Sequence, residues 1–282
     1  MSEQLVWQRL SDELQRLVAE FPGAAGACVR DLVTGAQTAV HEREVFPTAS
    51  SIKIHILAHL MQRAEAGAID VRRKVAIHRD LHAAGSGVLT YLDDPEELTV
   101  RNVAVLMIIV SDNTATNLCI DWATIDGTNA MLRGLGLSQT TLRRKMQDYA
   151  AIRRGDENVA SPLEMVEFLE ILYRGERLSP FVCEQTLAIL KKPKHGYLAP
   201  GLPQDVVIAN KPGGMERVRC DAAIVYQERR PYAICVMTKY GPVDRTVSEQ
   251  FIARAARTVH GYLATLDVTN AYGLGVPPAP PG

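Results

Sequence analysis

The order of apolar and polar residues predicts strands near both ends of the chain and helices around and between them. Short alternating or apolar segments bounded by turn residues are typical of strands, and a 3.6-residue apolar repeat is typical of helices. The expected strands cover residues 26–32, 37–41, 206–210, 221–227 and 231–238. One helix is expected before them, over residues 3–20, and another after them, over residues 247–263. Thr34 and Gly35 mark a turn between the first two strands.

The middle of the chain, from residue 50 to about residue 192, has a mainly helical pattern. Expected helices cover residues 50–66, 99–110 and 114–122, and a further helix begins after Ser161. Thr99, Asn113 and Ser161 are the expected caps, because short polar side chains accept hydrogen bonds from the first free N–H groups of a helix. Pro162 suits the first helical position after Ser161.

This arrangement predicts an α/β fold of the α+β kind. We expect one antiparallel sheet built from both termini, with helices on both faces and a helical insert. The sheet region is expected to combine residues 1–49 and 195–275, and the helical region to cover residues 50–194. The proline-rich residues 276–282 are expected to form a disordered tail.

Composition excludes several classes of function. The 282 residues have a hydrophobic content of 47%, which is ordinary for a globular protein. Lys and Arg number 31 against 32 Asp and Glu, so the chain lacks the basic footprint of a nucleic-acid-binding protein. The longest strongly apolar run, residues 103–110, is too short to span a bilayer. We expect neither nucleic acid nor membrane as a partner, and a small molecule as the substrate.

The first residues and the cysteines favour a reducing compartment. Residues 1–14 have neither the basic nor the apolar region of a secretory signal. The five cysteines show neither a CxxC pair nor the spacing of metal ligands, so free buried thiols are expected. We therefore predict a cytoplasmic protein, although a secreted protein after removal of its leader would have the same sequence.

Candidate chemistry begins at Ser50-Ser51-Ile52-Lys53, which places a hydroxyl and an amine one helical turn apart. A serine hydroxyl becomes a nucleophile when a base takes its proton, and Lys53 can be that base if its pKa is depressed. Ser50 follows a transition from coil to helix, so its N–H is expected at a helix N-terminus. An N–H group there can stabilise a developing oxyanion.

Ser111-Asp112-Asn113 supplies two further groups that acyl transfer to serine needs. Ser111 can pass a proton to the leaving nitrogen, and Asn113 can hold both Lys53 and a substrate amide. Taken alone, this tripeptide is also a common helix-capping sequence.

Lys211-Pro212-Gly213 is the third motif, expected at the end of a strand. Lys211 offers a cation for a substrate carboxylate and helps to keep Lys53 neutral. Gly213 lets the strand approach a ligand closely, and the N–H of Gly214 is expected to be the second oxyanion donor. Lys-Pro-Gly alone is an ordinary turn. The three motifs in this order, each at an expected element boundary, favour a common active site.

The chain resembles the class A serine β-lactamases and their penicillin-binding relatives, which carry Ser-x-x-Lys, Ser-Asp-Asn and Lys-Thr-Gly motifs. The matching stretches are residues 46–53, 67–70, 99–101, 111–117 and 211–214. The resemblance implies the fold of that family, a serine acyl-enzyme, and β-lactam or peptide-like substrates. It implies the roles given above for Ser50, Lys53, Ser111, Asn113, Lys211 and Gly214.

One departure from the family concerns a loop glutamate that activates the water for deacylation. The resemblance places Met146 at the position of that glutamate and Ala150 at the position of its asparagine partner. A thioether cannot accept a proton at neutral pH. Asp148 is the nearest carboxylate that could replace the glutamate after a shift of the loop. In addition, Pro212 lacks the hydroxyl that helps the family to bind a carboxylate. We therefore expect acylation to survive and deacylation to slow.

Other interpretations remain open at this point. The same scaffold could serve as a D,D-peptidase, esterase or amidase, or as a penicillin-binding receptor that is acylated once. A glutaminase fits less well, because the Ser-Asp-Asn motif favours β-lactamases. His55 and His59 stand four residues apart but lack a partnering glutamate motif, so no metal and no cofactor is expected.

Overall fold

The computed structural model describes residues 2–92, 97–270 and 272–276. Its helices are α1 (Ser2–Glu20), α2 (Lys53–Glu65), α3 (Val100–Ile109), α4 (Asn113–Ala123), α5 (Ile125–Gly134), α6 (Tyr149–Arg154), α7 (Pro162–Arg174), α8 (Pro180–Leu190) and α9 (Arg245–Asp267). Its strands are β1 (Ala24–Asp31), β2 (Gln37–Val40), β3 (Phe46–Pro47), β4 (Lys74–Ala76), β5 (Glu97–Thr99), β6 (Val159–Ala160), β7 (Val207–Met215), β8 (Val218–Tyr226) and β9 (Tyr232–Lys239). The predicted tail lies, from residue 277 onward, outside these described residues.

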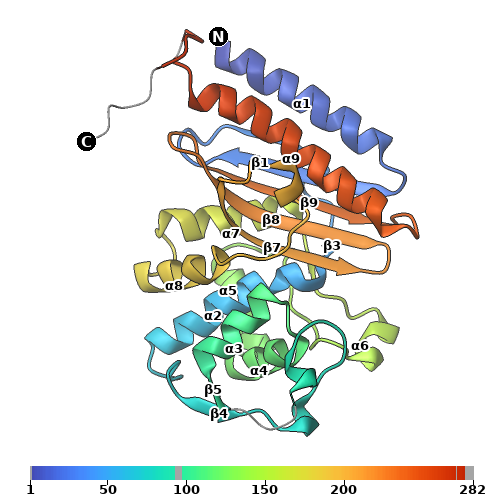
Figure 1. The fold of residues 1–282 in the computed structure, drawn as a ribbon, viewed down its shortest axis with the longest axis vertical. Helices are drawn as coiled ribbons and strands as arrows, with labels where there is room; N and C mark the ends of the chain where they lie inside the picture. Colours follow the sequence, from blue (N-terminus) through green and yellow to red (C-terminus); the bar gives the residue numbers. More distant parts are fainter. Residues whose placement is uncertain (1, 93–96, 271, 277–282) are drawn as a thin grey trace.

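A five-stranded sheet in the order β2-β1-β9-β8-β7 forms the centre of the fold. Every neighbouring pair of strands is antiparallel. Two strands come from the N-terminal end of the chain and three from the C-terminal end, so the predicted α+β fold is confirmed. Figure 1 shows α1 and α9 lying together on one face of the sheet, with the helices of the insert beyond the other face.

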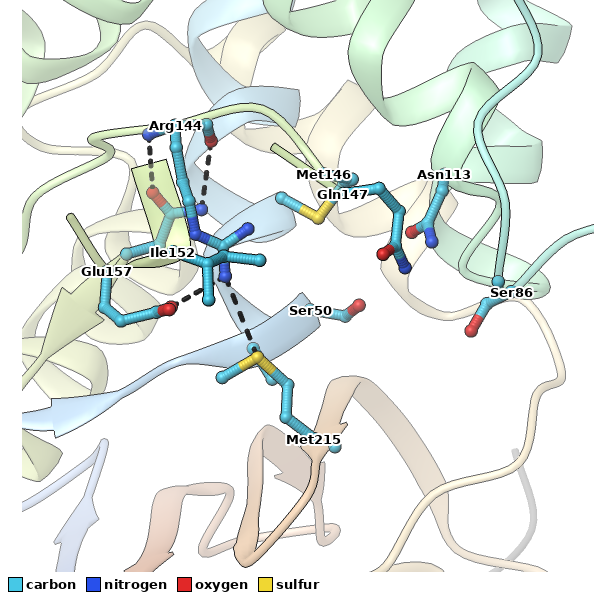
Figure 2. A pocket seen from close by; sticks show the side chains of 13 residues that line it. Ser50, Ser86, Asn113, Arg144, Met146, Gln147, Ile152, Glu157 and Met215 are labelled. Atoms are coloured by element: carbon cyan, nitrogen blue, oxygen red, sulfur yellow. Dashed lines mark hydrogen bonds and ion pairs between the residues drawn. The ribbon is translucent and has the colours of Figure 1, made fainter. Parts of the chain in front are cut away.

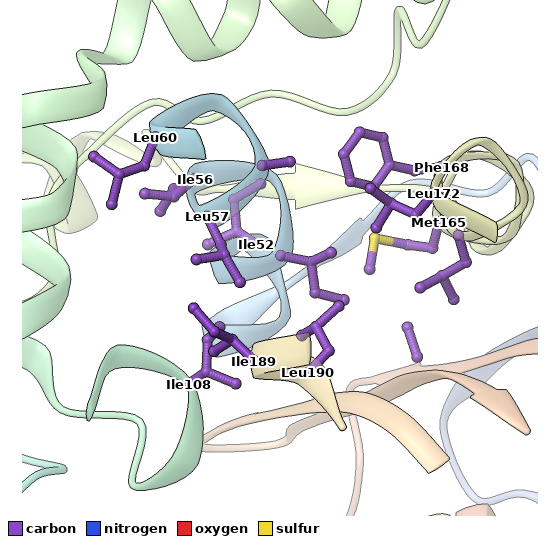
Figure 3. Packing of buried hydrophobic residues seen from close by; sticks show 14 of the residues in the cluster. Ile52, Ile56, Leu57, Leu60, Ile108, Met165, Phe168, Leu172, Ile189 and Leu190 are labelled. Atoms are coloured by element: carbon purple, nitrogen blue, oxygen red, sulfur yellow. The ribbon is translucent and has the colours of Figure 1, made fainter. Parts of the chain in front are cut away.

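Each face of the sheet packs against its own hydrophobic core. In β8, Ala222 and Ile224 belong to the core shared with the insert, whereas Ala223 and Val225 belong to the core under α1 and α9. This alternation follows from the two-residue repeat of a strand. Figure 3 shows side chains of α2, α7 and α8 meeting in the core shared with the insert, where Ile56 is fully buried. Because α2 is buried here, the residues at its start are held firmly against the sheet.

The first strand of the C-terminal group, β7, is longer than the sequence pattern predicts. We expected a strand over residues 206–210, but β7 continues through Lys211 to Met215 in unbroken register with β8. Pro212 can occupy this strand because β7 is the edge of the sheet, and an edge strand does not need every N–H for pairing. The Lys-Pro-Gly motif is therefore part of a strand rather than a turn.

Helix starts agree with the sequence at two positions and differ at two others. The side chains of Thr99 and Ser161 cap α3 and α7, as predicted. Asp112, rather than Asn113, caps α4, because its carboxylate accepts a hydrogen bond from the N–H of Ala115. Ser50 lies in a 3₁₀ turn over residues 49–52, and α2 begins only at Lys53. The final helix is also longer than predicted.

His55, on α2, is a polar residue enclosed in the insert core. Its ring lies against Phe168 with 4.4 Å between centroids, and neither ring nitrogen has a hydrogen-bond partner. Burial lowers the pKa of His55 to about 4 from the ordinary 6.5. As pH falls, His55 in the unfolded chain therefore takes up its proton before His55 in the folded chain does. The folded state loses stability as pH falls from 6.5 toward 4.

This buried histidine predicts a pH-dependent stability difference. Between about pH 7.5 and about pH 5, we expect the wild type to lose about 2 kcal/mol more unfolding free energy than His55→Leu. Leucine keeps most of the buried volume and has no titrating group. Urea unfolding of both proteins at the two pH values measures the difference. Equal losses in the two proteins would contradict the assignment of acid sensitivity to His55.

Candidate active site

Ser50 lies in a tight turn that is pressed against β7. The Ser51 hydroxyl donates to the carbonyl of Thr48 over 2.8 Å, which stabilises the turn. Ala49 has a left-handed φ of 46°, a strained conformation for a residue with a side chain. A Cβ atom on Gly213 would lie 2.4 Å from the Thr48 oxygen and 2.8 Å from the Ser50 nitrogen. Only glycine therefore allows β7 to come this close to Ser50.

Lys53 is fully buried one turn after Ser50. Its Nζ donates to the carbonyl and the hydroxyl of Ser111, over 2.8 and 3.0 Å, and to Asn113 Oδ1 over 3.3 Å. Within the described residues, no direct hydrogen bond joins Lys53 to Ser50. Burial, and then the charge of Lys211, hold the pKa of Lys53 well below its usual range. A neutral amine in this position can accept a proton.

Asp112 organises the wall of the site behind Ser111. The Asp112 carboxylate is buried and accepts hydrogen bonds from the backbone N–H groups of Val88 and Leu89, over 2.7 and 2.9 Å. It thereby ties the loop over residues 84–89 to the start of α4. Ser111 itself has a left-handed φ of 56°. This constrained turn directs the Ser111 hydroxyl toward Lys53.

Lys211 lies on β7 with its side chain buried. Its Nζ donates to the carbonyl of Pro212 over 2.9 Å. Burial lowers the pKa of Lys211 to about 8, and the Asp221 carboxylate acts in the opposite direction. At pH 7 the amine is therefore mostly protonated. Its positive charge acts on Lys53 and favours the neutral form of that amine.

A pocket of about 230 Å³ opens beside Ser50. Its lining includes Asn113, Met146, Gly214 and Met215. Figure 2 shows Ser50 at the centre of these side chains, with the loop that carries Met146 on the side away from Met215. Of the predicted site residues, the structure thus brings Ser50, Lys53, Ser111, Asn113, Lys211, Gly213 and Gly214 into one neighbourhood.

Met146 lines this pocket at the position where the resemblance implies a glutamate. Its backbone N–H donates to Asn117 Oδ1 over 2.8 Å, and its carbonyl accepts from Asn117 Nδ2 over 3.2 Å. Both bonds fix the direction in which the side chain at position 146 leaves the loop. The Asp148 carboxylate, in contrast, caps α6 by accepting from the N–H of Ala151 over 2.9 Å, and it does not line the pocket.

An ion pair closes the loop that carries Met146. Arg144 Nη2 lies 2.7 Å from Glu157 Oε2, and Asn158 Oδ1 accepts hydrogen bonds from two backbone N–H groups of the loop. Among the described residues that line the pocket, Glu157 alone carries a carboxylate. Because Glu157 is paired with Arg144, it is a poor source of a general base for deacylation.

Several pocket residues were not predicted from the sequence, among them Ser86, Gln147 and Met215. Met215 follows the Lys-Pro-Gly motif directly, so the continuation of the strand could have indicated it. Gln147 follows Met146, but no glycine or asparagine signals its left-handed φ of 61°. Ser86 enters the pocket because Asp112 and the N–H of Asn113 hold its loop in place.

Neither a metal centre nor a membrane span is found in the described part of the chain. No group of three or more His, Cys, Asp and Glu side chains there could hold a metal ion. In the same residues, no helix combines the length and the apolar character needed to cross a bilayer.

A family model described as the beta-lactamase enzyme family matches residues 9–263. The chain belongs to the beta-lactamase enzyme family. Its curated relatives include Beta-lactamase AER-1 from Aeromonas hydrophila, which is 27% identical over 87% of this chain and 83% of the relative. A carbapenem-hydrolyzing beta-lactamase, KPC, from Klebsiella oxytoca is 26% identical over 88% of this chain and 87% of the relative.

Solved structures give the same family fold. The penicillin-binding protein PBP-A has a TM-score of 0.81 and 29% identity, and the alignment covers 90% of this chain and 95% of PBP-A. A mutant of PBP-A was solved as an acyl-enzyme complex with penicillin G. It has the same TM-score and identity to this chain, and the alignment covers 90% of this chain and 96% of the mutant. The predicted resemblance to class A β-lactamases and penicillin-binding relatives is therefore confirmed.

Proposed function

We propose that this member of the beta-lactamase family is a serine hydrolase that acylates Ser50 with β-lactams or related amides and esters. The observation that carries the proposal is Lys53, which is buried, held at low pKa and hydrogen-bonded to Ser111 one turn from Ser50. That environment supplies the base that a serine nucleophile needs.

The acylation step uses groups that the fold brings together. Lys53 accepts the proton of the Ser50 hydroxyl, directly or through a bound water, while the Ser50 oxygen attacks the substrate carbonyl carbon. The N–H groups of Ser50 and Gly214 stabilise the oxyanion that forms. Ser111 then passes a proton to the leaving nitrogen as the C–N bond breaks. Lys211 holds a carboxylate of the substrate.

Deacylation is proposed to be slow, since Met146 cannot activate water and Glu157 is paired with Arg144. General-base catalysis of this kind is typically worth roughly 10²–10⁴-fold. The same observation favours a second candidate, a penicillin-binding receptor that is acylated and not regenerated. The relation to PBP-A, a mutant of which was solved as an acyl-enzyme, is consistent with either candidate.

Intact mass spectrometry after addition of benzylpenicillin tests the proposal. We expect an adduct of the mass of the intact penicillin on the wild type, none on Ser50→Ala, and a gradual return of free enzyme as hydrolysed product appears. An adduct that never decays would favour the receptor. Absence of both the adduct and any turnover would contradict the acylation of Ser50, and an adduct on Ser50→Ala would contradict the choice of nucleophile.

A further inference from the structure

A second cavity, of about 530 Å³, lies between the sheet and the insert. Its walls come from β1, the turn after α5, α7 and the turn between α7 and α8. Among the described residues, none lines both this cavity and the pocket beside Ser50. A Cβ atom on Gly136 would meet no atom within 4 Å, so the space beside the turn after α5 is open. Pockets of roughly 300–1,000 Å³ are typical of small-ligand sites, and this cavity falls in that range.

The charged residues that line the cavity are balanced in sign, with three cations and three carboxylates: Arg30, Arg174, Arg177, Glu167, Glu170 and Glu176. Glu170 occupies two of the cations, because its carboxylate is paired with Arg30 and with Arg174. These three side chains therefore form part of the wall and satisfy one another.

The other three charged side chains have little or no pairing. Within the described residues, Glu167 and Glu176 form neither a hydrogen bond nor an ion pair. Arg177 donates one long hydrogen bond, over 3.4 Å, to the carbonyl of Gly134. A guanidinium has five N–H donors, so most of those on Arg177 are available to a ligand.

Glu167 differs from Glu176 in its exposure to water. Glu176 is exposed, so solvent screens its charge, whereas Glu167 is half-buried. Burial raises the pKa of Glu167, and the charge of Arg30 acts in the opposite direction. A carboxylate that is partly removed from water and has no ion-pair partner is stabilised when a cation comes next to it. We therefore expect a cationic group of the ligand at Glu167.

The free guanidinium and Glu167 lie at opposite ends of the cavity, because the turn after α5 runs alongside α7. Near the start of α7, Glu164 accepts a hydrogen bond from the N–H of Gln139 over 2.9 Å. Beyond the end of α7, Arg177 contacts Gly134. The segment from residue 134 to residue 139 thus leads from Arg177 toward the part of α7 that carries Glu167.

The length of α7 along this cavity limits the size of the ligand. From Glu167 to Arg174 the helix rises about 10 Å, at roughly 1.5 Å per residue. An extended peptide spans at most roughly 3.3–3.6 Å per residue, so about three residues cover this distance. Leu135, Leu137 and Ile171 line the same cavity and offer apolar contact to side chains of such a peptide.

We propose that this cavity binds a short peptide of about three residues with both termini free. Its terminal ammonium group pairs with Glu167, and its terminal carboxylate pairs with Arg177. A free group of each sign at the two ends of one cavity matches such a zwitterion better than it matches a simple anion or cation. The site is separate from Ser50, and the proposal does not depend on the acylation of that residue.

Isothermal titration with three peptides tests the chemistry of the ligand. The probes are trialanine, N-acetyltrialanine, which lacks the ammonium group, and trialanine amide, which lacks the carboxylate. We expect the wild type to bind trialanine, and blocking either end to weaken binding about tenfold or more, the size of one charge-assisted hydrogen bond. Absence of trialanine binding, or equal affinity for all three peptides, would overturn the proposal.

Variants then assign each end of the peptide to its residue. Glu167→Gln should weaken binding of trialanine about tenfold or more and leave the affinity for N-acetyltrialanine unchanged. Arg177→Gln should act in the same way on trialanine and leave the affinity for trialanine amide unchanged. Glu184→Gln, on exposed surface outside the cavity, is the matched control and should bind trialanine like the wild type.

Thermal unfolding of each variant shows whether it is folded. A folded Glu167→Gln variant that loses affinity equally for trialanine and N-acetyltrialanine would overturn the role of Glu167. Unchanged binding of trialanine by both variants would show that the peptide binds elsewhere, and would overturn the site.

Discussion

Replacing Met146 with glutamate is expected to accelerate deacylation of the Ser50 adduct by roughly 10²–10⁴-fold. The backbone of residue 146 is hydrogen-bonded to Asn117 in both directions, so a new side chain should leave the loop toward the same pocket. A carboxylate there could take a proton from water next to the adduct. The decay of the penicillin adduct, followed by intact mass, gives the rate directly.

Met146→Gln is the matched control for this variant. Met146 is only 9% exposed, so both variants place a polar side chain of the same size in a buried position, but the glutamine amide cannot act as a base. We expect Met146→Gln to decay at the wild-type rate or more slowly. If the two variants release the acyl group equally fast, the missing glutamate is not what limits turnover.

Lys53→Met is expected to lower the rate of Ser50 acylation by roughly 10²–10⁴-fold. Methionine keeps much of the buried volume of Lys53 but cannot accept the serine proton. The three hydrogen bonds that Lys53 donates to Ser111 and Asn113 would also be lost. The Ser111 hydroxyl would then no longer be held for proton transfer to the leaving nitrogen. Stopped-flow measurement of adduct formation gives the rate.

Lys194 provides the comparison for Lys53. Burial also lowers the pKa of Lys194, to about 8, and its Nζ also donates to backbone carbonyls and to Asn210 Oδ1, but these partners belong neither to Ser111 nor to Asn113. Lys194→Met should keep the acylation rate within about twofold of the wild type, because general-base catalysis requires contact with the transferred proton. Acylation of Lys53→Met at the wild-type rate would show that another group is the base.

The hydrophobic pattern predicted the sheet, and the capping residues predicted two helix starts, because those features depend on local rules. Alternation of buried residues in β8 follows from strand geometry, and Thr99 and Ser161 cap their helices through bonds to residues three positions away. The end of β7 was predicted wrongly. Whether Pro212 can lie in a strand depends on that strand being at the edge of the sheet, which its own sequence does not reveal.

The active-site motifs indicated the residue types, and the fold provided their chemistry. The sequence by itself determined that two serines, two lysines and an asparagine are available, and that a methionine stands where the family has a glutamate. Only the tertiary structure decided that Lys53 is enclosed and held at low pKa, and that Gln147 faces Asn113. Both depend on burial and on contacts between residues far apart in the chain, and no local pattern encodes them.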